Sequence, residues 1–341
     1  MYFVGVDLHK HSISLCVMVQ DSSGRRVIDR KRLKCEDTER IADYFQKLGT
    51  FRVVVEATAS YEWLFQLLEP LAERLVLAHP KKLRVIAESA KKTDKLDAQT
   101  LAEFLTLDMI PEAWRPTPRV RQHRTLVRLR RRTKKRLTSV KNSIRWVLAG
   151  YNADIQNPFS KLGRVYLSKA SVNEADRFQL DLLLEELDQF TDRLKRIDQK
   201  LTEFATTAPA KEREARAVLS TIPGVGPVTI DVVLSELGDP QRFGSQRKAT
   251  AFAGLAPGIR ESAGRTKQLS ITKEGSSLLR WALVQVSWRV VNQTLRWRSV
   301  YERLKKKCGA KKAIVAVARR LWCVMIAMLQ SGQAYRLPGQ A

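Results

Sequence analysis

The stretch Tyr2-Phe3-Val4-Gly5-Val6-Asp7 decides the fold of the first third of the chain. Its run of aromatic and aliphatic residues predicts a buried β-strand, and the acid that ends the run is expected at the edge of a sheet. Ile13–Val19 predicts a strand paired with it, and the short aliphatic runs Phe51–Val55 and Leu75–Leu77 predict central strands. We therefore expect a sheet that contains this first strand.

Helical patterns lie between these strands. Asp37 and Thr38 can cap a helix that runs to about Lys47, and Tyr61–Arg74 has helical periodicity. Strands that alternate with helices predict an α/β layered domain, which we assign to residues 1–112.

A basic helical segment follows. Prolines between residues 111 and 118 mark the exit from the first domain, and no acidic residue occurs from Ala113 to Ala153. Apolar residues step by three and four from Leu126 to Val147, and again from Leu180 to Phe204. Two long helices with such seams predict an antiparallel coiled coil over residues 113–208, within or between protomers.

Basic residues far outnumber acidic ones, with 61 Lys and Arg against 35 Asp and Glu and a formal net charge of +26. A polyanion that neutralises such a surface releases its counterions, so its binding is favourable and sensitive to salt. A solvated helix face is the alternative for a run of charge, but unrelieved positive charge repels itself, and we favour contact with nucleic acid. The residues of the first long helix that we expect to make this contact are Arg124, Arg128, Arg131, Arg132, Lys134, Lys135 and Lys141.

A membrane surface is also anionic and is the other partner to consider. The sequence shows no apolar run of the roughly 20 residues that span a bilayer, and no basic segment precedes its first apolar residues. The four cysteines form no CxxC pair and the four histidines add no ligand-like spacing, so neither zinc nor a disulfide framework is expected. These features predict a cytoplasmic protein with a nucleic-acid partner and no membrane partner.

Four carboxylates form the candidate metal site. Asp7 and Glu56 each follow a predicted strand, and carboxylates at strand ends can converge in the crevice where layered folds bind ligands. Asp94 and Asp97 are three residues apart at the start of a predicted helix, which puts both on one face. Clustered carboxylates repel each other unless a divalent cation neutralises them, and their hard oxygen atoms suit Mg²⁺ or Mn²⁺. Such a site holds a phosphodiester and stabilises the charge on its attacking and leaving oxygens.

Each of these acids also has a purely structural interpretation. Asp7 and Glu56 could end their strands by hydrogen bonding, and Asp94 could be a helix N-cap. In so basic a chain we favour the metal site. The nearby basic residues that would guide a phosphate backbone towards it are Lys81, Lys82, Arg84, Lys91, Lys92 and Lys95.

The C-terminal region, residues 209–341, is expected to be mostly helical. Within it, Ile222-Pro223-Gly224-Val225-Gly226 resembles a helix-hairpin-helix turn, in which Gly224 and Gly226 would let backbone N–H groups approach a DNA phosphate. A tight turn between helices is the alternative, and we favour the DNA role. The tryptophans expected in the core, rather than as platforms for base stacking, are Trp281, Trp288 and Trp297.

Three motifs resemble those of the DEDD transposases, insertion-sequence recombinases with a RuvC-like nuclease domain of the RNase H type. These motifs are Gly5–Lys10, Val55–Thr58 and Thr93–Ala98. The segments that match the C-terminal transposase domain of that family in order and spacing are Ala253–Pro257, Ser262–Gly264, Ile271–Gly275 and Val315–Leu321. The resemblance covers nearly the whole chain.

The resemblance implies a fold, a mechanism and partners. The fold is a RuvC-like α/β domain, a central coiled coil and a mostly helical C-terminal domain with a nucleophilic serine. The four acids would hold Mg²⁺, and Ser262 would attack a DNA phosphate to give a phosphoserine link and a free 3′-hydroxyl. A structured non-coding RNA, the bridge RNA, would pair with donor and target DNA, and the assembly would be a homotetramer.

The surroundings of Ser262 suit this role. A serine hydroxyl is a weak nucleophile until a metal or a carboxylate activates it. Arg265, Lys267 and Lys273 are close in sequence and are expected to contact nucleic acid. The rival serines, each interpreted as a loop or capping residue, are Ser270, Ser276 and Ser277. The chain departs from the family at Ala59, where Gly is usual, and at Ala263, where Ser or Thr is usual, but neither change removes a ligand.

Two other functions explain part of the sequence. A metal-dependent RuvC-like nuclease, such as a junction resolvase, would use the acids with water as the nucleophile, but it leaves the Ser262 segment without a role. A non-catalytic RNA-binding or architectural protein accounts for the positive charge. It does not account for four acids placed among basic residues, where they would weaken the binding of nucleic acid. An RNA-guided DNA recombinase accounts for both features and is the function we expect.

Overall fold

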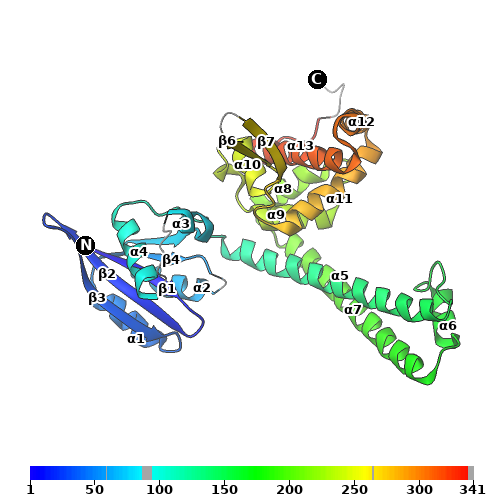
Figure 1. Ribbon diagram of the computed structural model, residues 1–341, viewed down its shortest axis with the longest axis horizontal. Coiled ribbons are helices and arrows are strands. Elements are labelled where there is room, and N and C mark those ends of the chain that lie inside the picture. Colours follow the sequence, from blue (N-terminus) through cyan, green and yellow to red (C-terminus); the bar gives the residue numbers. More distant parts are fainter. Residues whose placement is uncertain (59, 87–93, 263–264, 337–341) are drawn as a thin grey trace. The chain divides into compact units, whose positions relative to one another are not determined.

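The computed structural model describes residues 1–58, 60–86, 94–262 and 265–336, with the backbone alone in residues 84–86, 94–96, 259–262 and 265–268. The chain divides into two compact units, unit 1 (Met1–Arg115) and unit 2 (Pro116–Ala341) (Figure 1).

Unit 1 is built on a five-stranded sheet in the order β3-β2-β1-β4-β5 (Figure 1). Its strands are β1 (Tyr2–Leu8), β2 (Ser12–Asp21), β3 (Gly24–Lys34), β4 (Phe51–Glu56) and β5 (Arg74–Ala78). β1, β2 and β3 pair antiparallel, whereas β4 and β5 continue from β1 in parallel. The expected strands are all present, and the one that opens the chain is the central strand of the sheet.

β3 is the strand that the sequence pattern does not predict. Of its 11 residues only Leu33 is buried, and the rest are largely charged. The strand forms an edge of the sheet, where charged side chains guard against pairing with another chain. A strand that buries so little has no clear alternation of apolar residues, which is why its sequence does not reveal it.

Helices cover both faces of this sheet. They are α1 (Thr38–Lys47), α2 (Glu62–Leu68), α3 (Pro80–Ile86) and α4 (Asp94–Thr106). α1 and α2 bury their apolar residues against one face together with Val4 and Val6, and α4 packs on the other. α1 has the expected bounds with Asp37 at its N-cap, although that side chain makes no capping hydrogen bond. α2 is shorter than the predicted Tyr61–Arg74 because Pro70 interrupts the helical pattern.

Unit 2 begins with two helices of 33 residues each, α5 (Pro118–Gly150) and α7 (Glu174–Thr206), joined through the short α6 (Lys161–Lys169) (Figure 1). α5 starts at Pro118 because proline has no N–H to satisfy there, and the Thr117 side chain accepts a hydrogen bond from the Val120 N–H.

The expected apolar seams of α5 and α7 meet in a common core. Leu137, Val140 and Ile144 of α5 pack with Leu180 and Leu187 of α7. Long paired helices are therefore present where the sequence predicts them. The knobs-into-holes packing of a true coiled coil stays a prediction.

The remainder of unit 2 is mostly helical, as expected. Its elements are α8 (Ala210–Ser220), α9 (Pro227–Leu237), η1 (Pro240–Arg242), α10 (Gln246–Phe252), β6 (Pro257–Ser262), β7 (Arg265–Ile271), α11 (Ser277–Gln293), α12 (Leu295–Cys308) and α13 (Ala310–Ser331). The β6–β7 hairpin is not predicted from the sequence. Val127 of α5 packs with Val232 of α9 and Ala282 of α11, so the helix pair and the C-terminal helices share a core.

α13 contradicts the expectation that the chain has no sufficiently long apolar segment. Among the described residues this one helix, Ala310–Ser331, is long and apolar enough to cross a membrane, by length and composition alone. Its buried residues Leu321, Trp322 and Met325 form part of the core of unit 2. A helix that is packed against α10, α11 and α12 at once needs apolar side chains on several sides, and this packing accounts for its composition.

Two of the three tryptophans expected in the core lie at the surface instead. Trp297 is buried, and its indole N–H donates a hydrogen bond to the Tyr335 hydroxyl. Trp281 and Trp288 are 37% and 39% exposed on the outer side of α11. Helical spacing alone does not distinguish an inner from an outer face when the opposite face of the helix is apolar as well.

Candidate functional site

Asp7 and Glu56 lie at neighbouring strand ends on one face of the sheet. β1 and β4 are parallel, with Val6 opposite Val55, so the next residue of each strand is an acid. Val53 and Val55 belong to the core under α1 and α2, whereas Val54 packs with α4. Because side chains alternate along a strand, Glu56 shares the α4 face with Val54, and Asp7 lies on that face because Val4 and Val6 point to the other.

Gly5 brings α4 against this face. A Cβ atom at Gly5 would lie 2.0 Å from the Ala98 carbonyl oxygen and 2.6 Å from the Ala102 nitrogen, so only glycine permits the contact. Asp97, which directly precedes Ala98, is half-buried in the first turns of α4. The helix that carries two of the predicted ligands is therefore packed on the strand that carries Asp7.

The structure brings these acids to one region but does not complete a metal site among its described side chains. No group of three or more His, Cys, Asp or Glu side chains within the described part of the chain is placed to hold a metal ion. Asp94 begins α4, but its side chain lies outside the described residues. Asp7 is paired with His9, whose Nε2 lies 3.1 Å from its Oδ2. The oxygen donors of Asp7, Glu56 and Asp97 are the kind that Mg²⁺ prefers.

Basic side chains are found at the same end of the sheet. An open hollow is lined by Lys10 and His11 of the β1–β2 turn, by Trp63 at the start of α2, and by Lys34, which pairs with Glu36 of the same hollow at 3.1 Å. Lys81 and Lys82 are exposed on α3, whereas the side chains of Arg84, Lys91, Lys92 and Lys95 lie outside the described residues. The exposed Lys10, Lys81 and Lys82 add positive charge at this end of unit 1, which favours the approach of phosphate.

Ser262 is the last residue of β6 and pairs in register with Arg265 of β7. It therefore stands at the tip of a two-stranded hairpin rather than in an irregular loop. The side chains of Ser262, Arg265 and Lys267 lie outside the described residues, as do Ala59 and Ala263 entirely. Lys273 is exposed just beyond the hairpin, in the left-handed conformation at φ 56°.

The base of the hairpin is fixed by two glycines. A Cβ at Gly254 would lie 2.0 Å from the Glu274 carbonyl oxygen, and one at Gly275 would lie 2.1 Å from that of Phe252. Both have positive φ, which favours glycine. Arg280 of α11 donates a hydrogen bond of 2.6 Å to the Glu274 carbonyl. The two ends of the hairpin are thereby held together, as are their backbones by the hydrogen bond from the Lys273 N–H to the Gly254 carbonyl.

The rival serines have other surroundings. The Ser276 hydroxyl accepts a hydrogen bond from the Leu279 N–H and caps α11, which confirms the capping interpretation. Ser277 is the first residue of that helix, and Ser270 is exposed in β7.

The turn at Gly224 and Gly226 joins α8 to α9. Gly224 has φ 83°, and a Cβ there would lie 2.9 Å from Gln293 Oε1 and 3.1 Å from Arg289 Cβ. Gly226 is the N-cap of α9, where a Cβ would meet nothing within 4 Å. Close packing on α11 therefore explains Gly224 without DNA, and the helix-hairpin-helix role stays a prediction.

The predicted basic residues of α5 separate into two groups. Arg124 donates to the carbonyl oxygens of Ser235 and Glu236, at 2.7 and 2.9 Å, and Arg128 pairs with the buried Glu236 carboxylate at 3.0 Å. The Arg131 guanidinium lies 4.2 Å from the centroid of the Trp281 ring. Burial and the charge of Lys134 lower the pKa of Lys141, which lies over the ring of Phe159. The second group is exposed to solvent and consists of Arg132, Lys134 and Lys135; Arg128 is also exposed but belongs to the first group through its pair with Glu236.

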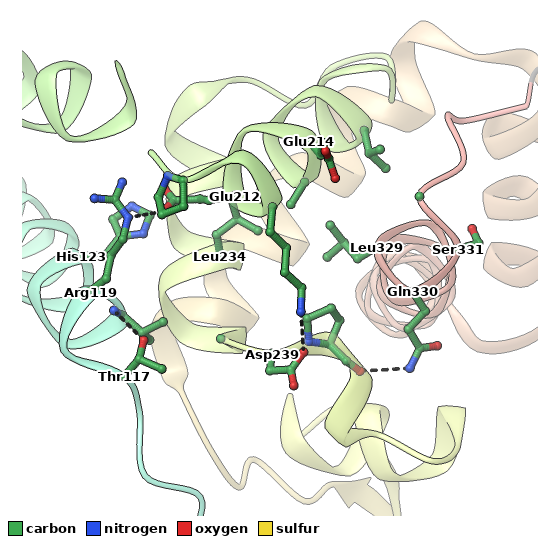
Figure 2. A pocket seen from close by; sticks show the side chains of 18 residues that line it. Thr117, Arg119, His123, Glu212, Glu214, Leu234, Asp239, Leu329, Gln330 and Ser331 are labelled. Carbon is green, nitrogen blue, oxygen red and sulfur yellow. Dashed lines mark hydrogen bonds and ion pairs between the residues drawn. The ribbon is translucent and has the colours of Figure 1, made fainter. Parts of the chain in front are cut away.

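A cavity of about 520 Å³ lies elsewhere in unit 2, between the start of α5, α8 and the end of α13 (Figure 2). Four of its charged side chains form pairs: Arg119 pairs with Glu212, and Lys211 lies 3.8 Å from Asp239. Gln330 donates a hydrogen bond to a backbone carbonyl of η1 (Figure 2). The residues that line it include none of the predicted site residues, so we assign the cavity to the packing of these helices.

Two family models match the chain over different regions. A model of the IS110-type DEDD transposases, described as Transposase, matches residues 4–153, and one described as Transposase IS116/IS110/IS902 family matches residues 216–302. The first includes all four acids, and the second includes the α8–α9 turn, the β6–β7 hairpin and α11. The chain belongs to the DEDD transposase family.

Relatives of this DEDD transposase match along nearly its whole length. The transposase for insertion sequence element IS1111A of Coxiella burnetii is 25% identical over 98% of this chain and 91% of its own length. The pilin gene-inverting protein of Moraxella bovis is 23% identical over 98% of this chain and 97% of its own. The transposase for insertion sequence element IS1328 of Yersinia enterocolitica is 24% identical over 87% of this chain and 85% of its own. The protein is an insertion-sequence transposase of the IS110 family.

Proposed function

We propose that this transposase cuts and rejoins donor and target DNA through a phosphoserine intermediate on Ser262, with Mg²⁺ held by Asp7, Glu56, Asp94 and Asp97. The observation that carries the proposal is the register of β1 and β4, which sets Asp7 beside Glu56 on the face that α4 covers. The pairing of Ser262 with Arg265 at the end of the β6–β7 hairpin supports the choice of Ser262 as the nucleophile, because the register sets it opposite a basic residue.

The residues of the chain would share the reaction as follows. The Ser262 oxygen forms a bond to a DNA phosphorus, the bond to the 3′ oxygen breaks, and the 3′-hydroxyl leaves with a proton. The serine loses its own proton to a base, since the hydroxyl is weakly nucleophilic otherwise. The covalent link conserves the energy of the broken phosphodiester, so attack by another 3′-hydroxyl reseals the strand and releases the serine without ATP. A divalent cation, when bound by the four acids, supplies stabilisation of the negative charge on the phosphate.

Nucleic acid would be held by cations of both units. The exposed Arg132, Lys134 and Lys135 of α5 would neutralise phosphates, as would Lys10 and Lys273. A structured guide RNA would select donor and target by base pairing, which leaves the protein to recognise backbone and shape. A tetramer assembled through the α5–α7 helix pair would present several active sites to the paired DNA ends.

A covalent-trapping assay tests the proposal. The protein, RNA transcribed from the flanks of the element, Mg²⁺ and labelled donor and target DNA are combined, and a denaturing gel is examined for DNA linked to protein. We expect a linked band in the wild type that is lost in Ser262→Ala and in Asp7→Ala, and that persists in Ser277→Ala, which changes the first residue of α11.

Other outcomes point to the competing functions. Cleavage without a linked band, unchanged in Ser262→Ala, indicates a nuclease that uses water. Binding without any cleavage, unaffected by Asp7→Ala, indicates an architectural protein. Omission of the RNA separately tests guidance, because an RNA-guided enzyme loses joining when the RNA is absent.

A further inference from the structure

The outer face of α11 carries two tryptophans in solvent. Trp281 and Trp288 are seven residues apart, so they project from the same side of the helix at a spacing of about 10 Å along its axis. They are 37% and 39% exposed, whereas Leu283, Val286 and Val290 on the opposite side are buried in the core. Each ring packs on one neighbour and keeps more than a third of its surface in solvent, and two large aromatic rings exposed on one helix face indicate a contact surface.

Cations border the ring of Trp281, and another cation follows Trp288 in the sequence of α11. Arg131 of α5 stacks over Trp281 at 4.2 Å from its centroid, and Lys134 lines a small cleft with the same ring. The exposed Arg289 follows Trp288 on α11. Trp288 itself meets the buried ring of Tyr301 edge to face at 5.3 Å, which fixes the plane of its indole.

The two segments that build this surface are free of acidic residues. None occurs from Ala113 to Ala153, which includes α5, or from Gly275 to Tyr301, which includes α11. One acid, Asp231, lines the cleft, but it is buried and paired with His123 and Arg216. Aromatic rings beside positive charge suit a partner that carries both flat apolar groups and negative charge.

We propose that Arg131, Lys134, Trp281, Trp288 and Arg289, which together we term the α11 aromatic face, bind an unpaired segment of nucleic acid. Its bases stack on the tryptophan rings and its phosphates lie against the cations. At roughly 3.4 Å per stacked base, the two rings span about three nucleotides. Duplex DNA does not offer this contact, because its bases stack on one another.

The surface continues to the turn between α8 and α9. Gly224 packs against Arg289 and Gln293 of α11, and the exposed Val228 at the start of α9 lines the cleft with Trp281. An unpaired strand on the aromatic face therefore passes beside the Gly226 end of α9, where backbone N–H groups of the first turn can donate to a phosphate. The proposal rests on the proposed function only in that the transposase binds nucleic acid, and it assigns no role to Ser262 or the four acids.

Binding of short unstructured oligonucleotides tests the proposal on the full-length protein. Fluorescence anisotropy is measured with oligouridine RNA, oligothymidine DNA and a duplex of mixed sequence. We expect Trp281→Ala and Trp288→Ala each to weaken binding of the single strands by about tenfold, with duplex affinity within about twofold of wild type. Trp288→Phe keeps a stacking ring and should retain most of the affinity. Trp146→Ala is the matched control, because Trp146 is 74% exposed in the last turns of α5, away from this surface along the chain.

The two possible sources of the strand are separated by the same measurement. If the tryptophan variants lose affinity for oligouridine alone, the surface binds RNA. If they lose affinity for oligouridine and oligothymidine alike, it binds any unpaired strand, such as a separated DNA end. Photocrosslinking with 4-thiouridine, followed by peptide mapping, should place the adduct in α11. Circular dichroism and the thermal midpoint of each variant establish that it is folded.

Three outcomes overturn the proposal. The first is wild-type affinity for both single strands in folded Trp281→Ala and Trp288→Ala, or crosslinks confined to other segments. The second is equal loss in Trp146→Ala. The third is a change in molar mass by light scattering in the tryptophan variants, which makes the face a contact between copies of the chain. Ser262→Ala should bind the oligonucleotides as the wild type does, so failure of the covalent mechanism and failure of this proposal are distinguishable.

Discussion

Gly5 sets the distance between the central strand and the helix that carries Asp94 and Asp97. A Cβ at this position would lie 2.0 and 2.6 Å from backbone atoms of α4, and backbone cannot rotate away as a side chain can. The residue lies two positions before Asp7, on the same face of β1. The geometry of the predicted metal ligands therefore depends on a residue that has no side chain.

Gly5→Ala should lower the free energy of unfolding of unit 1 by about 3 kcal/mol, because α4 must shift to relieve the overlap. The same shift moves Asp97 relative to Asp7, so strand joining should fall even at temperatures where the variant is folded. Urea denaturation and the covalent-trapping assay measure the two effects. Gly150→Ala, at the open end of α5, is the control and should leave both unchanged or slightly raise stability. Wild-type stability in Gly5→Ala would contradict the close contact.

Cys16 lies opposite Gly5 on β2 and is fully buried beneath α4. Burial raises the pKa of its thiol above the ordinary value for cysteine, chiefly because the thiolate is desolvated. Under native conditions a thiol reagent should therefore modify the exposed Cys308 first and Cys16 only on opening of unit 1. Because the folded state favours the neutral thiol, this contribution to stability is present below the ordinary cysteine pKa and is lost as the pH rises through the folded value. Mass spectrometry after timed labelling follows both sites, and rapid native labelling of Cys16 would count against the packing of α4.

At the scale of elements, the edge strand β3 is attached to the rest of unit 1 by few apolar contacts. Tyr44 of α1 donates a hydrogen bond of 2.7 Å to Asp29 of β3, and Lys31 lies over the same ring at 4.8 Å. Burial and this hydrogen bond raise the pKa of Tyr44. These polar contacts substitute for the apolar burial that β3 lacks.

Tyr44→Phe should cost about 1 kcal/mol of folding free energy, since it leaves the Asp29 carboxylate without its donor. The effect should shrink at high pH: the raised pKa means that Tyr44 stabilises the fold below the ordinary tyrosine pKa and loses this contribution as the pH rises. Thermal denaturation at several pH values tests this. Tyr2→Phe is the control, because the described residues include no hydrogen-bond partner for the Tyr2 hydroxyl. An equal loss of stability in Tyr2→Phe would show that the Tyr44–Asp29 hydrogen bond does not account for the effect.

The basic face of α5 shows that one charged helix serves two purposes. Arg128 pairs with Glu236, whose side chain is only 4% exposed, whereas Arg132 is exposed one turn further along. The first is part of the attachment of α5 to α9, together with the contact between His123 and Asp231 at 3.0 Å. Arg132 is available to nucleic acid.

Arg128→Ala should lower the stability of unit 2 by about 2 kcal/mol, because a buried carboxylate loses its cation, although solvent around the half-exposed arginine reduces the penalty. Arg132→Ala should leave stability unchanged but reduce the slope of log affinity against log salt by about one for duplex DNA. Chemical denaturation and salt-dependent anisotropy distinguish the two. If Arg128→Ala and Arg132→Ala both change DNA binding and neither changes stability, this assignment of separate roles to the two arginines is wrong.

At the scale of the whole molecule, each unit has a core of its own. Unit 1 encloses Phe45, Phe51 and Leu64 between the sheet and α1 and α2, and unit 2 encloses Trp322 and Met325 among its C-terminal helices. The acids belong to unit 1 and Ser262 to unit 2. A reaction that needs both therefore depends on the intact chain.

Residues 1–115 and 116–341 should each fold when expressed separately, with spectra of α/β and helical proteins, but neither should form the covalent link to DNA. Removal of Mg²⁺ with a chelator should likewise abolish the link in the full-length protein without loss of helical signal. Circular dichroism and the trapping gel measure both. A covalent link formed by residues 116–341 alone would exclude a role for the acids in forming it.

The sequence by itself determined most of the elements and their order. The runs at β1, β2, β4 and β5 and the seams of α5 and α7 are local patterns of burial, and local patterns survive in the one-dimensional chain. The same holds for Asp7 and Glu56, because an acid at the end of an apolar strand is visible in the sequence alone. The motifs of the DEDD family carried the interpretation from elements to activity.

Only the tertiary structure decided which side chains are free. It turned Trp281 and Trp288 outward and placed Trp297 inside, and it bound Arg124 to carbonyls of α9 while leaving Arg132 exposed. It also made a strand of β3 and a hairpin around Ser262, whose partners are set by pairing rather than by periodicity. The physical reason is that burial of a charge or a ring depends on what packs against it, and that neighbour is usually distant in sequence.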